Sequence, residues 1–347
     1  MKYVTLKDVC TINMGQSPDS DSYNDNGEGV PFFQGNADFG ERYPVTRKWC
    51  SAPTKMAAPE DILISVRAPI GAMNYAKEEC CIGRGLAALT PDKTKVSPKF
   101  IFWLLKGKNA ELNSKGTGST FKAIGRKVLE ETKVPDISLE KQLEHSETLE
   151  KIYAVIQHRK SELQMLDDLI KARFVEMFNL SDCIYKSLGE CTDFVDYRGH
   201  TPELSDEGII RMVNAKSVGK GFFKYVDEFV TEETYDAWMH RGFGYPGDIL
   251  FVTEGHTFGN TCLIPEDMTK FALGQRVITI KGKEEIKNAF LCSYMQTDMF
   301  WKDINVYRTG GTAQGIRSKD LVKVMVPIPP IEQQIEFVRF VHKVDKS

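Results

Sequence analysis

The chain has 347 residues, of which 41% are hydrophobic and 27% are charged, and its formal net charge is −3. This length exceeds one ordinary hydrophobic core, so we expect two globular units joined by a connecting element. The composition predicts a protein that folds in water, and the near-neutral charge argues against a broad basic surface that coats nucleic acid.

The N-terminal segment MKYVTLKDVC lacks the apolar core of a signal peptide, and no run of about eighteen apolar residues follows it. We therefore expect a cytoplasmic protein without a membrane contact. The cysteines, eight in all, form no CxxC pair and have no histidine at metal-ligand spacing. They are expected to be reduced thiols, with no bound metal and no cofactor.

Short phrases recur in the same order in the two halves of the chain, which indicates an internal duplication. The paired phrases are Gly15-Gln16-Ser17-Pro18 with Gly199-His200-Thr201-Pro202, Asn36-Ala37 with Asn214-Ala215, Pro59-Glu60-Asp61-Ile62-Leu63 with Pro246-Gly247-Asp248-Ile249-Leu250, Thr117-Gly118-x-Thr120 with Thr309-Gly310-x-Thr312, Val134-Pro135 with Val326-Pro327, and Leu139-Glu140-x-Gln142 with Ile331-Glu332-x-Gln334. We interpret the shared positions as scaffold and expect function in the loops that differ.

Each copy is predicted to be mixed α and β. Short apolar runs at 62–66 and 249–252, bounded by Pro and Gly, are typical of buried strands. The segments 97–106 and 287–301 have helical spacing of aromatic and aliphatic residues. Asp61 and Asp248 stand before the two strands as turn residues, so a structural role is favoured for both carboxylates over a catalytic one.

One long helix is predicted between the copies, because residues 138 to about 178 contain neither Pro nor Gly. A heptad pattern runs along it and predicts packing against another helix. Arg159 and Arg173 interrupt the stripe and could fix its register. The helix-pairing residues are Leu149, Ile152, Ile156, Leu163, Leu166, Ile170 and Met177.

The second copy ends on the same opening, at Ile331, and a short second helix is predicted there. An antiparallel pair of these helices would relate the copies by an approximate two-fold axis. The fold class is therefore α+β, with two mixed α/β domains separated by a long coiled-coil helix. The expected boundaries are 1–137 for the first domain, 138–180 for the long helix, 181–328 for the second domain and 329–347 for the short helix.

The junction phrase VP-x-(I/P)-x-(L/I)-E-x-Q stands where each domain meets the helix that follows it. With this arrangement, the chain resembles the specificity subunit of type I restriction-modification systems. The resemblance implies two target recognition domains that each read half of a split, asymmetric DNA sequence. It also implies docking of methyltransferase subunits, which bring S-adenosylmethionine for adenine N6 methylation, and of motor-nuclease subunits for cleavage. A further expected partner is a second copy of the chain, bound through the unpaired part of the long helix. The subunit itself would be non-catalytic.

Candidate DNA-binding residues are polar or cationic side chains on loops, because Arg suits guanine, Asn and Gln suit adenine, and Lys suits phosphate. In the first copy they are Gln16, Ser17, Gln34, Asn36, Arg67, Arg84, Lys115, Thr117, Ser119, Thr120 and Lys122. In the second copy they are Arg198, His200, Thr201, Asn214, Lys216, Thr253, Glu254, His256, Arg276, Arg308, Thr309, Thr312, Gln314 and Arg317. The recurring Thr-Gly-x-Thr segments could be scaffold or could bind phosphate, which is the same at every sequence.

The sequence contains few features that would indicate an enzyme. Neither a glycine-rich cofactor loop with an Asn/Asp-Pro-Pro-aromatic motif nor a GxxxxGK[ST] loop is present. Glu266, Asp267, Glu285 and Lys287 resemble a metal-dependent nuclease spacing only as a chance match. The remaining alternative to DNA recognition is a duplicated scaffold that binds only other proteins, which the modest negative charge favours slightly.

Overall fold

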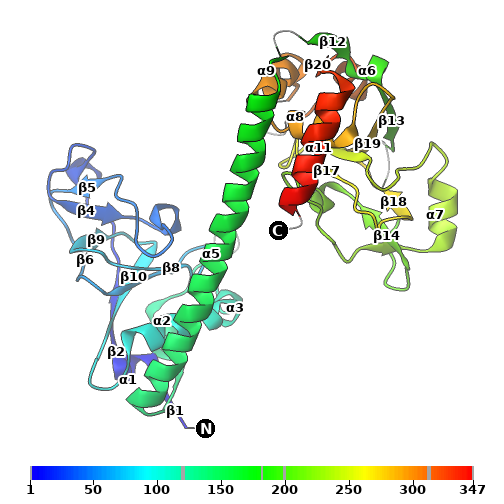
Figure 1. The fold of residues 1–347 in the computed structure, drawn as a ribbon. Coiled ribbons are helices and arrows are strands. Elements are labelled where there is room, and N and C mark those ends of the chain that lie inside the picture. Colours follow the sequence, from blue (N-terminus) through cyan, green and yellow to red (C-terminus); the bar gives the residue numbers. More distant parts are fainter. Residues whose placement is uncertain (1, 119–121, 181–182, 198–200, 311–313, 346–347) are drawn as a thin grey trace. The chain divides into compact units, whose positions relative to one another are not determined.

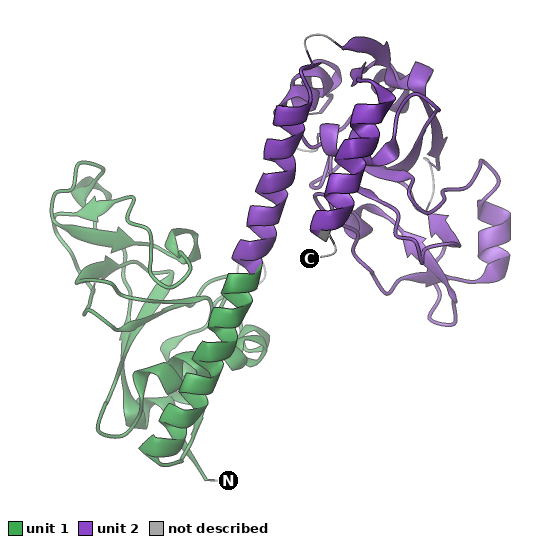
Figure 2. Ribbon diagram, in the orientation of Figure 1, with its two compact units in different colours: residues 1–159 green, residues 160–347 purple. Residues whose placement is uncertain are grey.

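The computed structural model describes residues 2–118, 122–180, 183–197, 201–310 and 314–345. The candidate DNA-binding residues Ser119, Thr120, Arg198, His200 and Thr312 lie outside these ranges. The chain divides into two compact units, unit 1 at Met1–Arg159 and unit 2 at Lys160–Ser347 (Figure 2). The division falls inside helix α5 (Leu139–Met177), so one continuous helix contributes residues to both units (Figure 1).

Unit 1 is built on an antiparallel sheet with the strand order β2-β10-β7-β8 and a second sheet with the order β3-β5-β4-β9-β6. The predicted strand at 62–66 is β7, whose residues Ile62–Ser65 are all buried. Its strands are β1 (Tyr3–Thr5), β2 (Cys10–Met14), β3 (Tyr23–Asn24), β4 (Val30–Phe33), β5 (Trp49–Cys50), β6 (Met56–Ala57), β7, β8 (Met73–Tyr75), β9 (Cys80–Ile82), β10 (Leu86–Pro91) and β11 (Lys133–Pro135). Its short helices are α1 (Leu6–Val9), α2 (Pro98–Gly107), α3 (Asn109–Ser114) and α4 (Arg126–Glu130), with 3₁₀ turns at Ser20–Ser22 and Asn36–Asp38.

Unit 2 repeats this plan with the sheet orders β13-β19-β16-β17 and β15-β14-β18. The parallel pair β14 with β18 corresponds to the parallel pair β4 with β9 of unit 1. Its strands are β12 (Ile184–Ser187), β13 (Thr192–Asp196), β14 (Ile210–Val213), β15 (Phe229–Val230), β16 (Ile249–Val252), β17 (Thr261–Leu263), β18 (Phe271–Leu273), β19 (Val277–Gly282) and β20 (Met325–Ile328). Its helices besides α5 are α6 (Leu188–Cys191), α7 (Glu232–Trp238), α8 (Asn288–Tyr294), α9 (Asp298–Tyr307), α10 (Ser318–Leu321) and α11 (Ile331–Asp345), with a 3₁₀ turn at Ala215–Ser217.

The predicted helix at 287–301 is two helices rather than one. Helix α8 ends at Tyr294, and α9 begins after Thr297, whose side chain accepts a hydrogen bond from the Phe300 backbone amide. A threonine in this position satisfies an amide that has no carbonyl partner in the first helical turn. The threonine cap therefore starts a new helix inside a segment whose apolar spacing is continuous.

The long helix is confirmed, because α5 runs without interruption over 39 residues. The heptad residues along it differ in exposure. Leu149, Ile152, Ile156 and Leu163 are exposed on their helix, and Leu163 is 64% exposed. Leu166, Ile170 and Met177 are half-buried, and the last two pack on the core of unit 2. The proposed pairing of the exposed residues with another helix remains a prediction.

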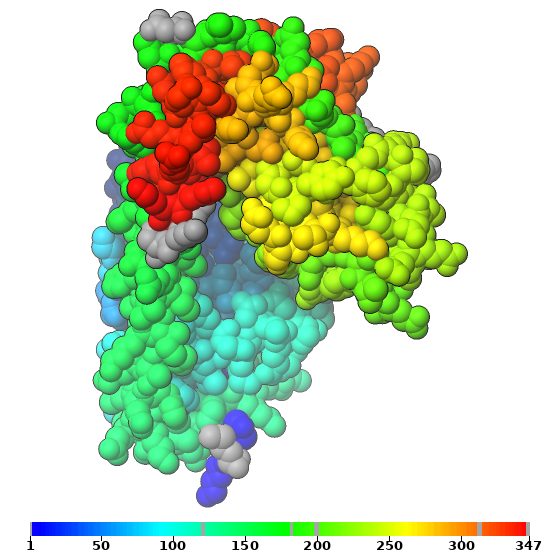
Figure 3. All heavy atoms as spheres, turned by 45° about the vertical axis from the view of Figure 1, so that its right-hand side comes forward, coloured from blue at the N-terminus to red at the C-terminus, as the bar shows by residue number. Residues whose placement is uncertain are grey.

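In unit 2, the last part of α5 lies alongside α11 (Figure 3). The buried ring of Phe337 on α11 contacts Phe174, with ring centroids 5.4 Å apart, and Phe178, with centroids 5.5 Å apart. Arg173 pairs with Glu336 across the two helices at 3.4 Å and lies over the ring of Phe340 at 5.9 Å. A cation in the predicted stripe is thus accommodated by an acid and an aromatic ring on the neighbouring helix.

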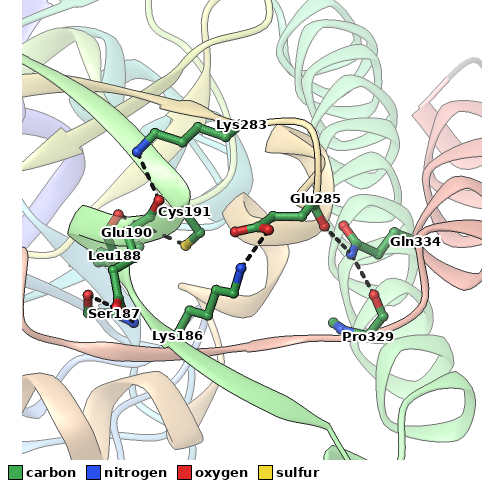
Figure 4. Close-up of polar contacts among 9 residues, drawn as sticks. All are labelled: Lys186, Ser187, Leu188, Glu190, Cys191, Lys283, Glu285, Pro329 and Gln334. Carbon is green, nitrogen blue, oxygen red and sulfur yellow. Dashed lines mark hydrogen bonds and ion pairs between the residues drawn. The ribbon is translucent and has the colours of Figure 1, made fainter.

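The repeated junction phrase has the same structural role in both units. Gln142 and Gln334, in the first turns of α5 and α11, are 2% and 0% exposed. The Gln334 Oε1 accepts from the Lys287 backbone amide at 2.9 Å. Its Nε2 donates to the carbonyls of Glu285 at 3.0 Å and Pro329 at 2.8 Å (Figure 4). Buried polar groups require such partners. We call these contacts the glutamine junction.

Gln142 makes the matching set of bonds in unit 1. Its Oε1 accepts from the Ser97 backbone amide at 2.9 Å, and its Nε2 donates to the carbonyls of Ile137 at 2.9 Å and Lys95 at 3.4 Å. Ser97 and Lys287 are the residues that precede α2 and α8, so each glutamine fastens the start of a junction helix to the start of a domain helix. The duplicated phrase therefore encodes a duplicated joint.

The cysteines carry free thiols, and all of them except the half-buried Cys183 are buried. Burial raises the pKa of Cys10, Cys80, Cys262 and Cys292 to about 12, so these thiols stay protonated at neutral pH. In the described ranges, no helix is both long and apolar enough to cross a lipid bilayer.

Candidate nucleic-acid interface

Loops of unit 1 converge where β2 and β7 end and β10 begins. The Gly15 amide donates to the Leu86 carbonyl at 2.9 Å, and the Gln16 amide to the Ile82 carbonyl at 3.0 Å. The Arg84 amide lies 3.4 Å from the Ser17 hydroxyl. The Gly85 amide donates to the Gln34 carbonyl at 3.1 Å. These hydrogen bonds bring together candidate residues that are as many as 68 positions apart in the sequence, from Gln16 to Arg84.

The segment around Thr117 closes the same edge. Thr117 and Ala123 exchange backbone hydrogen bonds of 3.0 and 2.9 Å, which form the base of a hairpin. This base is held on the residues after β7, because the Ile124 amide donates to Val66 at 2.9 Å and the Ala68 amide to Lys122 at 3.0 Å. We call the set 15–17, 34–36, 66–68, 83–85, 117–118 and 122–123 the strand-end edge of unit 1.

Unit 2 has a corresponding strand-end edge, formed by 214–216, 253–255, 274–276, 309–310 and 314–315, in which the backbone bonds around the segment 309–316 repeat those around 117–124 of unit 1. Thr309 and Gly315 exchange bonds of 2.8 and 3.0 Å. The Ile316 amide donates to Thr253 at 2.9 Å, and the Gly255 amide to Gln314 at 2.9 Å. The recurring Thr-Gly segment is thus scaffold at its base in both units. Its proposed phosphate contact is untested.

The side chains on the edge of unit 1 are mostly free to reach a ligand. Gln16, Gln34, Arg67, Arg84, Thr117 and Lys122 are exposed, whereas Ser17 and Asn36 are half-buried. Lys115 is also exposed, but its ammonium lies 2.6 Å from the Glu111 carboxylate. Lys108 and Lys115 together lower the pKa of Glu111 to about 2.

The side chains on the edge of unit 2 make more internal contacts. The Asn214 side-chain Nδ2 donates to the Glu228 carboxylate at 2.6 Å, and the Lys216 ammonium contacts the same carboxylate. Glu228 therefore binds two candidate residues. The Lys216 ammonium is the first cause of the lowered pKa of Glu228. No sequence signal identified Glu228, because it lies on a separate segment.

The remaining candidates of unit 2 fall into three groups. Thr253 is buried. Its neighbour Glu254 is exposed, and its carboxylate lies 3.0 Å from Arg276 Nε. Arg308 donates to Gln314 at 3.2 Å. Thr201, His256, Thr309 and Arg317 are exposed, with Arg317 bound to Asp320 at 3.1 Å. His256 lines a groove of about 870 Å³ beside Phe174 and Trp301.

The nuclease-like acids are not assembled. Glu285 forms an ion pair with Lys186 at 2.6 Å (Figure 4). The Lys287 backbone belongs to the glutamine junction. Asp267 accepts a hydrogen bond from the Tyr225 hydroxyl at 2.8 Å. Among the described residues, no group of three or more His, Cys, Asp or Glu side chains could hold a metal ion. Asp61 and Asp248 are buried turn residues that accept the amides of Ala58 and Tyr245.

Two copies of one α+β domain, each fastened by a glutamine junction to a helix and each presenting polar loops at a strand-end edge, make this a duplicated two-domain protein. The family model described as the type I restriction modification DNA specificity domain matches residues 1–165 and 193–347. The chain therefore belongs to this family.

The chain is similar to individual proteins over different shares of its length. A putative type I restriction enzyme MjaX specificity subunit of Methanocaldococcus jannaschii is 44% identical over 156 residues, which cover 45% of this chain and 37% of the relative's own length. The HsdS subunit of Thermoanaerobacter tengcongensis is 44% identical over 46% of this chain and 39% of that chain, with a TM-score of 0.43. The S subunit of M. genitalium covers 99% of this chain and 89% of that chain with a TM-score of 0.59 and 16% identity, which shows a shared fold.

Proposed function

We propose that the chain is the DNA-recognition subunit of a type I restriction-modification complex and reads a split, asymmetric target. One observation carries this proposal. Both units present exposed polar loops on the same hydrogen-bonded frame, and the side chains on that frame differ between the units. A common frame suits the uniform phosphate backbone, and different side chains suit different bases.

The proposal keeps the domain boundaries at 1–137, 138–180, 181–328 and 329–347, and it assigns no catalytic step to this chain. Methyltransferase subunits would dock on it and supply adenine N6 methylation with their own S-adenosylmethionine, and motor-nuclease subunits would join for restriction. The small net charge of −3 supports a local DNA contact at the two edges rather than a wide basic surface.

The test is to express the full chain with the modification subunit of its own system and to map methylated adenines in the cellular DNA. We expect one split motif whose two specified parts differ and whose intervening bases are unread. Cells with a catalytically inactive modification subunit are the control. Absence of a motif would contradict the proposal.

A protein-interaction scaffold is the alternative, and it makes a different prediction. A scaffold complex would leave duplex DNA unshifted at low salt, with or without the modification subunit. A DNA-recognition subunit would shift random duplex weakly, with an affinity that falls steeply as salt rises, and would bind more tightly when the modification subunit is added.

A further inference from the structure

One exposed position on the two strand-end edges carries opposite charges. Arg67 follows β7 in unit 1 and forms a backbone bridge with Ala123, while Glu254 follows β16 in unit 2 and forms the equivalent bridge with Gly315. The flanking hydrogen bonds are also equivalent. The Val66 carbonyl accepts from the Ile124 amide, and the Thr253 carbonyl accepts from the Ile316 amide, both at 2.9 Å. Arg67 and Glu254 therefore occupy equivalent backbone positions in the two strand-end edges.

The surroundings of Arg67 leave its guanidinium available. Arg67 is exposed and has no acidic partner within the described part of the chain. The Val66 amide beside it donates to Gly85 at 2.9 Å. A side chain at Gly85 is excluded, because an added Cβ would lie 2.3 Å from the Gln34 carbonyl oxygen. Unit 1 thus presents a planar set of N–H donors at this point.

The corresponding site of unit 2 is an acid held by a base. The Thr253 amide donates to Arg276, which occupies the place of Gly85 in a left-handed conformation with φ of 69°. Its Nε lies 3.0 Å from Glu254 Oε1, and the two side chains are 55% and 57% exposed. An isolated carboxylate facing DNA phosphates would be repelled. The bound guanidinium balances that charge while the carboxylate keeps acceptor capacity.

We infer that Arg67 and Glu254 are specificity-determining residues that read opposite hydrogen-bond patterns in the two half-sites. Arg67 donates to the O6 and N7 atoms of a guanine in the half-site of unit 1. Glu254, oriented by Arg276, accepts from the N4 amino group of a cytosine in the half-site of unit 2. This inference rests on the proposed function and deepens it, because it assigns one base contact to each unit.

The test uses the full chain in complex with its modification subunit. Once the motif of the unsubstituted complex is mapped, Glu254→Gln and Arg67→Gln complexes are titrated with duplexes in which each specified base pair is changed in turn. Glu233→Gln on α7 and Lys127→Gln on α4 are exposed control substitutions. Both test residues are exposed, so circular dichroism and thermal midpoints should match those of the controls.

We expect Glu254→Gln to lower discrimination about tenfold to hundredfold at one cytosine of one half-site and to leave the other half-site unchanged. Arg67→Gln should do the converse at one guanine. Unchanged discrimination in both variants would overturn the inference, and so would an Arg67→Gln loss that is equal on all sequences, which indicates a phosphate contact. If the unsubstituted complex binds no DNA, the proposed function itself fails, and the reference titration shows that before any variant is compared.

Discussion

The glutamine junctions and the strand-end edges are both duplicated, but they treat side chains differently. At the junctions, Gln142 and Gln334 each accept one backbone amide and donate to two backbone carbonyls. At the edges, the same backbone bonds carry Arg67 in one unit and Glu254 in the other. A repeated phrase in a duplicated protein can therefore mark either a joint or a frame, and the exposed residues that differ on a shared frame are the places to look for recognition.

The largest effect is expected at the glutamine junction of unit 2, from a substitution of Gln334. Replacement by leucine keeps a side chain of similar size but removes the partner of the part-buried Lys287 amide and Glu285 carbonyl and of the buried Pro329 carbonyl. We expect Gln334→Leu to lower the free energy of unfolding of unit 2 by about 2–4 kcal/mol. Equilibrium unfolding in guanidinium chloride measures this loss.

The adjacent Gln333 is exposed and supplies the control. Gln333→Leu should change stability by less than about 0.5 kcal/mol. Equal stabilities of the two variants would mean that the junction bonds add nothing to the fold. The same loss is expected for Gln142→Leu in unit 1, because its partners correspond one by one.

A smaller effect is expected on the strand-end edge of unit 1, at Lys122. Its carbonyl accepts the Ala68 amide, and its side chain is exposed and suited to phosphate. Lys122→Ala removes the cation and keeps the backbone bond. We expect affinity to fall several-fold on every duplex alike, and the salt dependence of binding to drop by about one phosphate contact. Filter-binding titrations at graded salt measure both quantities. A loss confined to one sequence would instead assign Lys122 to base contact.

The smallest effect is expected at Glu111, which binds Lys115 beside the edge at 2.6 Å. Glu111→Gln frees this cation, so DNA affinity should rise about two- to threefold at low salt. The lowered pKa of Glu111, about 2, means that its contribution to stability is present above its ordinary pKa and is lost as pH falls through about 2.

Acid titration of the folded state tests the second half of this prediction. The stability of the Glu111→Gln variant should depend less on pH below about 4.5 than that of the unsubstituted chain. Unchanged DNA affinity at neutral pH would indicate that Lys115 does not face the ligand.

The sequence predicted what local patterns determine. The absence of Pro and Gly identified α5, and the short apolar runs identified β7 and β16. The break after Tyr294 escaped prediction because the threonine cap interrupts a continuous apolar pattern. The acid that holds Asn214 and Lys216 also escaped, since Glu228 lies 14 residues from Asn214 and no local rule pairs them.

The candidate site shows the same limit. The repeated Thr-Gly phrase was identified as a shared element, but its docking on residues 66–68 and 253–255 depends on contacts across more than fifty positions in the chain. The Glu254–Arg276 pair joins residues 22 positions apart, and Arg276 has a left-handed backbone, which is uncommon for a residue other than glycine. Which candidate residues share an edge is therefore decided by long-range pairing, which the local sequence does not reveal.

The hairpin bases have a practical consequence for protein engineering. Each base closes on one pair of residues, Thr117 with Ala123 and Thr309 with Gly315, and the enclosed segments 118–122 and 310–314 are of equal length. A segment can thus be cut at one base and grafted onto the other without altering the number of residues or the closing rungs. If the proposed function holds, such transplants would give a modular way to alter target preference with parts that this molecule already contains.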